Sequence, residues 1–81
     1  TISDGEFEVI EAEIIETSEL INKELKNSNL PEELRIGAVL RNKKVIIPRS
    51  DFTFKKDDRV VFIVKKESIS FVENIFRLSS V

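Results

Sequence analysis

Carboxylates are the side chains of this sequence that could support catalysis or bind a metal, because its 81 residues include neither histidine nor cysteine. Two pairs stand out: Glu11 with Glu13 on one face of an expected strand, and Asp57 with Asp58 in an expected turn. A catalytic pair must be positioned as acid and base. Residues two apart on any strand lie about 6 to 7 Å apart, and Asp is favoured in turns by its own backbone hydrogen bonds. We therefore predict no catalytic residue, no metal site and no enzymatic activity.

The missing residue types exclude further classes of site. Without His or Cys there is no disulfide framework, no zinc site of thiolates or imidazoles, and no Ser-His or Cys-His catalytic pair. The two glycines, Gly5 and Gly37, cannot form a G-x-G-x-x-G or G-x-x-x-x-G-K phosphate loop. We therefore expect no cofactor in this chain. No apolar run approaches the roughly 18 residues of a membrane span.

Charge is unevenly distributed around a formal net charge of −2. Residues 1–22 contain seven acids and no base, which indicates either a surface for a basic partner or the solvated face of an edge strand. Residues 35–66 contain ten bases against three acids, with Phe52, Phe54 and Phe62 among them. A sheet that binds nucleic acid could have this pattern. The negative net charge of the whole chain argues against it, so we expect no nucleic-acid partner.

Alternating apolar and charged residues predict several strands. Residues 6–16 alternate with one slip of phase, which predicts a strand with a bulge near Val9 and Ile10. Residues 34–41 predict a half-buried strand, and Asn42-Lys43 a two-residue hairpin turn to the strand that Pro48 ends. A short strand around residues 52–54 follows. The strand expected over residues 59–65 has a continuous apolar run at residues 60–64, which is typical of a central strand covered on both faces.

Two helices are expected between and after these strands. Residues 20–27 predict a short helix after a possible N-cap at Thr17-Ser18, with Ile21 and Leu25 on one face. A second helix is expected from Ser68 or Ser70, and the latter would form a capping box with Glu73. Its predicted buried stripe contains Ile69, Val72 and Phe76, with Ile75 beside it.

The predicted fold is therefore a single α+β domain over residues 1–81, with element order β-α-β-β-β-α. Its two helices should cover one face of a small, mostly antiparallel sheet. The other face must then be wet or meet another copy. A domain of this size buries only about 60 to 65% of the surface of its unfolded chain, which makes self-association a reasonable expectation.

Four segments carry a resemblance to a known family: Asn29-Leu30-Pro31, residues 36–41, residues 45–49 and residues 58–61. With them, nearly the whole chain resembles the RCK_C (TrkA_C) C-terminal regulatory domain of bacterial potassium transport proteins. The resemblance implies a non-catalytic fragment of a longer protein, preceded by a separate RCK_N domain where NAD or ATP would bind. It also implies a homodimer that gates a membrane potassium channel subunit of the TrkH type, on the cytoplasmic side of the membrane.

The sequence departs from this family where such domains usually have glycine, at Asn22, Lys43, Ser50 and Asp57. Asn and Asp tolerate a positive φ at modest cost, whereas Lys43 should be more strained.

Some relatives of this family bind cyclic di-AMP between two C-terminal domains. Arg41 and Arg49 are the candidate ligand or interface residues here, and the favoured interpretation is that they are solvated strand-end residues or dimer contacts. A small-ligand sensor is thus the alternative to a regulatory and assembly domain, and a nucleic-acid-binding module is a third hypothesis.

Overall fold

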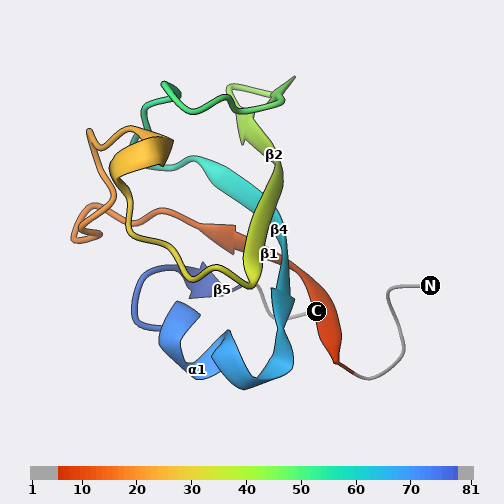
Figure 1. Cartoon of the computed structure of the whole chain (residues 1–81). Coiled ribbons are helices and arrows are strands. Elements are labelled where there is room, and N and C mark those ends of the chain that lie inside the picture. Colours follow the sequence, from red (N-terminus) through yellow and green to blue (C-terminus); the bar gives the residue numbers. More distant parts are fainter. Residues whose placement is uncertain (1–5, 79–81) are drawn as a thin grey trace.

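The computed structural model describes residues 6–78, which form a five-stranded antiparallel sheet with strand order β3-β2-β4-β1-β5 (Figure 1). The strands are β1 (Phe7–Glu13), β2 (Leu34–Arg41), β3 (Lys44–Ile46), β4 (Arg59–Lys65) and β5 (Arg77–Leu78). Short 3-10 turns cover Leu25–Asn27 and Lys66–Ser68, and α1 (Ile69–Val72) follows the second. The predicted antiparallel sheet and central position of residues 59–65 are confirmed.

Strand β4 is buried on one face only. Its alternate side chains Val60, Phe62 and Val64 are fully buried, whereas Ile63 on the opposite face is 36% exposed. The register sets Ala12 of β1 and Val39 of β2 beside Val60 on the buried face. The apolar run predicts that β4 is covered on both faces. Within the described residues of a single chain, only one of these faces is covered.

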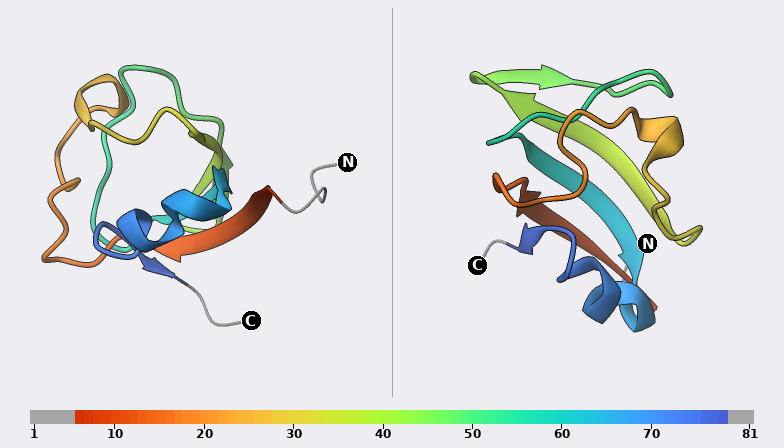
Figure 2. Two further views of the ribbon diagram at one scale, coloured as in Figure 1. Left: turned by 60° about the horizontal axis from the view of Figure 1, so that its bottom comes forward. Right: turned by 90° about the vertical axis from the view of Figure 1, so that its left-hand side faces the viewer.

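Two loop segments form a second layer over the buried face. The NH groups of Asn22, Leu25 and Lys26 donate to the carbonyls of Phe54, Phe52 and Ser50, over 2.8 to 2.9 Å. An isolated antiparallel bridge joins Glu24 to Thr53. Figure 2 shows these loops and the sheet enclosing the space between them. The core in that space includes the buried side chains of Leu20 and Phe54.

The helix predicted over residues 20–27 is wrong. This segment contains turns and a single 3-10 turn, and Asn22 has a φ of 66°. Three of its NH groups bond across to residues 50–54, and others bond to carbonyls three residues earlier. Docking on a neighbouring extended segment thus outweighs a weak local preference for helix. The only α-helix among the described residues is α1, so the expected pair of helices over one face is also wrong.

The bulge predicted near Val9 and Ile10 is wrong as well. Strand β1 pairs with β4 without interruption from Phe7 to Glu13. The slip of phase instead places apolar side chains on both faces: Ile10 and Ala12 pack in the core, while Val9 is 54% exposed. The register shift lies in β2, between Ile36 and Ala38. Gly37 occupies that position, as glycines at bulges commonly do.

The predicted C-terminal helix is short. Val72 and Phe76 are buried, as expected from the predicted stripe. The capping box is wrong, because the N-cap residue is Ser68, without a side-chain cap, and Glu73 lies at the C-terminal end of α1. Among residues 6–78, no helix is long and apolar enough to cross a membrane.

The predicted hairpin is confirmed. Arg41 pairs with Lys44, which leaves Asn42 and Lys43 as a two-residue turn with φ values of 52° and 66°. Positive φ at both positions is the type I′ pattern that twists with the strands. Asn22 and Asp57 also have positive φ, whereas Ser50 does not. Three of the four positions expected to have replaced a family glycine thus have a backbone that favours glycine.

We predict that Lys43→Gly stabilises the domain by about 0.5 to 1 kcal/mol, because relief of the left-handed strain exceeds the entropy cost of glycine. Urea or thermal unfolding measures the change. Ser50→Gly is the matched control and should lower stability slightly, because no positive φ is relieved there. Equal effects of the two substitutions would contradict the assignment of strain to Lys43.

Candidate functional site

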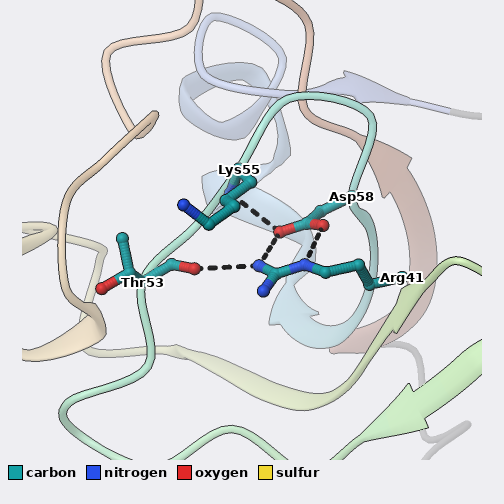
Figure 3. A network of polar contacts seen from close by, with 4 residues as sticks. All are labelled: Arg41, Thr53, Lys55 and Asp58. Carbon is teal, nitrogen blue, oxygen red and sulfur yellow. Dashed lines mark hydrogen bonds and ion pairs between the residues drawn. The ribbon is translucent and has the colours of Figure 1, made fainter.

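The most extensive polar network of the described residues is centred on Asp58, which is 1% exposed. Nε of Arg41 donates to Oδ1 of Asp58 over 2.8 Å, and Nη2 donates to Oδ2 over 2.6 Å (Figure 3). Oδ2 also accepts the backbone NH of Lys55 over 2.8 Å, and Nη2 of Arg41 donates to the carbonyl of Thr53 over 2.9 Å. Bidentate pairing of this kind is strong and fixes orientation.

Strand pairing places these two side chains together. Leu40 of β2 lies opposite Arg59 of β4, and this is the last residue pair between the two strands. Arg41 comes directly after Leu40 and Asp58 directly before Arg59, so the two residues lie at the same end of the strand pair. The hydrogen bond to Asp58 raises the pKa of Arg41 above its usual value, although partial burial opposes this. The guanidinium also lies over the ring of Phe52, 4.9 Å from its centroid. Arg41 therefore joins the hairpin, the turn before β4 and the second layer.

This geometry separates the two candidate arginines. Arg41 directs its guanidinium toward Asp58 and Thr53, and its side chain is 26% exposed. Arg49 lies in the exposed turn after β3, where its carbonyl accepts the NH of Phe52. Arg41 thus has a structural role, and Arg49 is the more accessible of the two cations.

The two carboxylate pairs, Glu11 with Glu13 and Asp57 with Asp58, also lie in structural rather than catalytic surroundings. Asp57 is exposed and Asp58 buried, so the two do not form a shared acidic site. Glu11 accepts a hydrogen bond of 2.6 Å from Nη2 of Arg59, which raises the pKa of Arg59. Within residues 6–78, no group of three or more Asp or Glu side chains is arranged to hold a metal ion.

Among the described residues, half of the ten bases in residues 35–66 form ion pairs. The five that contact a carboxylate are Arg41, Lys56, Arg59, Lys65 and Lys66. Two of the carboxylates, Glu8 and Glu11, lie in β1. The acidic N-terminal segment and the basic later segment therefore offset each other within the fold, which sequence counts alone could not reveal.

Two surfaces of the described residues are considered as contacts for a ligand or partner. One is an open groove of about 690 Å³ between residues 15–29 and residues 71–76, with Ser18 and Phe71 among its lining. It was not expected from the sequence, because its two walls lie about 50 residues apart in the chain. The other is the exposed sheet face on which Val9 and Ile63 lie side by side. Both side chains are at least one-third exposed, as is Val45 of β3 at 67%.

A comparison with protein families decides the classification: the sequence model of the TrkA-C domain matches residues 9–77. The chain belongs to the TrkA-C domain family. The TrkA-C match begins within β1 and ends at β5, so it includes the Arg41–Asp58 network and both surfaces.

Curated relatives of this chain are named as Trk system potassium uptake proteins. The Trk system potassium uptake protein TrkA of Azorhizobium caulinodans is 42% identical over 79 residues, 98% of this chain and 17% of that protein. A TrkA homolog of Archaeoglobus fulgidus is 32% identical over 95% of this chain and 18% of its own length. The TrkA-C chain thus spans about a sixth of the relatives it matches.

The fold of this TrkA-C domain also occurs in a solved structure described as an RCK domain with cda. The two superpose with a TM-score of 0.76 over 85% of this chain and 97% of the other, at 19% identity. At that identity the likeness establishes the fold.

We predict that Asp58→Asn lowers the free energy of unfolding by about 3 kcal/mol, because it leaves a partly buried guanidinium without its ionic partner. Urea unfolding at neutral pH measures the loss. Glu11→Gln is the matched control, since its arginine contact is equally short but exposed, and it should change stability little. A loss as small for Asp58→Asn as for Glu11→Gln would refute the structural role of the network.

Proposed function

We propose that this domain is a non-catalytic regulatory and assembly module of a Trk-type potassium uptake system. The observation that carries the proposal is the match, over nearly the whole chain, to proteins named for Trk-system potassium uptake. The geometry agrees, because the buried carboxylate of Asp58 is held in an ion pair with Arg41 that stabilises the fold. In this proposal the domain acts on other molecules through contacts at its surface.

In this proposal the chain is one part of a longer cytoplasmic protein and follows a nucleotide-binding RCK_N domain. Two copies pair, and the assembly contacts a membrane channel subunit of the TrkH type. The domain favours one state of the channel only by the difference between its interaction free energies with the open and closed states. No cofactor bound within the domain is required.

A cyclic dinucleotide or another small ligand at a groove between two copies is the second candidate function. The similar RCK domain structure described as containing cda motivates it. The two candidate arginines do not contribute equally, because Arg41 is engaged with Asp58. Arg49 is then the cation that would contact a phosphate.

Nucleic-acid binding receives less support. Five bases of residues 35–66 contact carboxylates, and the chain as a whole is negative. A nucleic-acid interface needs an unneutralised basic patch.

Potassium uptake tests the first function. In cells that depend on the channel subunit and the full-length protein for potassium, we expect deletion of this domain to abolish regulated uptake, measured as rubidium influx. Full-length protein carrying Lys43→Gly is the control that keeps the fold, and it should retain regulation. Unchanged regulation after the deletion would reject the proposed function.

Calorimetric titration with cyclic di-AMP tests the second function. If a ligand phosphate contacts Arg49, binding heat should appear with the unaltered chain and weaken at least about tenfold with Arg49→Ala, because a charge-assisted contact is lost. Lys56→Ala, another exposed cation, is the control. No heat and no thermal shift with the unaltered chain would remove this candidate.

A further inference from the structure

We propose that the hairpin between β2 and β3, together with the chain that follows it, docks on the surface of an anionic lipid bilayer. We call residues 42–51 the hairpin edge. It includes β3, an edge strand of the sheet, and forms the upper border of the domain in the right-hand view of Figure 2. The inference goes beyond the proposed function, because it assigns a lipid contact that is separate from the channel subunit.

The hairpin edge carries the two most exposed large apolar side chains of the described residues. Val45 is 67% exposed and Ile47 is 71% exposed. Ile46 lies between them and packs against the core. Because side chains alternate along an extended chain, its two neighbours are left on the solvent side. Exposed apolar side chains that lie together mark contact sites for membranes or proteins.

Cations flank this apolar pair on both sides. Lys43 and Lys44 precede it, Arg49 follows it, and all three residues are exposed. None of the three contacts a carboxylate of residues 6–78, because the ion pairs found there involve other bases. The hairpin edge contains these three bases and one acid, Asp51, so its net charge is +2. It is therefore a small basic patch on a chain whose total charge is negative.

The acidic strand β1 does not cancel this charge. The sheet order puts three strand spacings between β3 and β1, which is about 14 Å at roughly 4.8 Å per spacing. The Debye length at physiological ionic strength is only about 8 Å. Two acids of β1 also lie close to bases, since Glu8 contacts Lys66 and Glu11 contacts Arg59. An anionic surface therefore meets the hairpin edge without strong repulsion from β1.

The ion pair of Arg41 with Asp58 holds the hairpin in place. Arg41 lies opposite Lys44 in the hairpin, and its guanidinium bonds to Asp58 and to the carbonyl of Thr53. The hairpin is thus fixed to the turn before β4 and to the second layer. A surface that is already ordered loses little conformational freedom when it binds.

The residue types favour lipid over other anionic partners. Nucleic-acid surfaces stack aromatic side chains on bases, whereas Val45 and Ile47 are aliphatic. An acidic peptide could add as a strand to an exposed edge, but β3 is only three residues long, and Pro48 follows soon after it. Such a short edge resists strand addition. A bilayer needs neither feature, because aliphatic side chains enter its headgroup region while Lys and Arg extend to the lipid phosphates.

Vesicle binding tests the charge requirement. The chain should bind vesicles of phosphatidylcholine with phosphatidylglycerol, should not bind pure phosphatidylcholine, and should be released by high salt. Lys44→Gln with Arg49→Gln should weaken binding about 25-fold, because each cation near an anionic bilayer contributes about fivefold. Lys65→Gln with Lys66→Gln is the matched control. It removes the same charge at the other end of β4 and should change binding little.

Single tryptophans test whether the apolar pair enters the bilayer, because the chain contains no tryptophan. With anionic vesicles, the emission of Ile47→Trp should shift to the blue and be quenched by brominated lipid. Phe71→Trp, at an exposed position of α1, is the control and should show neither effect. Circular dichroism confirms that each variant is folded.

Four results would overturn the lipid contact. They are no retention by anionic vesicles at millimolar lipid, equal binding to neutral vesicles, binding that the hairpin variants do not weaken, and an unshifted emission of Ile47→Trp. Polyglutamate bound as tightly as the anionic vesicles would also overturn it and assign the hairpin edge to an acidic protein. None of these measurements involves potassium, so their failure leaves the uptake function standing, and a failed uptake test leaves the lipid contact standing.

Discussion

The partly buried ion pair between Arg41 and Asp58 is the interaction on which the rest of this fold depends. It joins the end of β2 to the turn before β4 and holds the carbonyl of Thr53, a residue of the second layer. The same layer supplies Phe54 to the core. A domain of 81 residues is only marginally stable. One satisfied charge pair at a junction of three segments therefore has a large effect on the free energy of unfolding.

Local rules predict the sheet well. Alternation identifies β2, the continuous apolar run identifies β4, and the glycine usual in the family at the position of Lys43 indicates the positive φ found there. The helix expected over residues 20–27 does not form because this segment makes its hydrogen bonds to residues 50–54, and no local pattern reveals a partner so far along the chain. The resemblance to the family gives Arg41 as a candidate ligand or interface residue. Its bond to Asp58 cannot be foreseen in the same way, because it depends on the register between two strands.

The two faces of the sheet explain how a domain with so little chemistry can act. On the inner face, apolar side chains and the second layer form a closed core. On the outer face, Val9, Ile63 and Val45 are each at least one-third exposed in the single chain. A TrkA-C domain that regulates by assembly requires a stable fold and one specific contact surface. Neither histidine, cysteine nor a glycine-rich loop is needed for either.

The central claim is that the ion pair between Arg41 and Asp58 joins β2, the turn before β4 and the second layer. A double-mutant cycle of Arg41→Ala, Asp58→Ala and the double variant, followed by urea unfolding, tests it most directly. The account predicts a coupling energy of roughly 1 to 3 kcal/mol between the two positions, as residues in one salt-bridge network show. Losses of stability that simply add would contradict it.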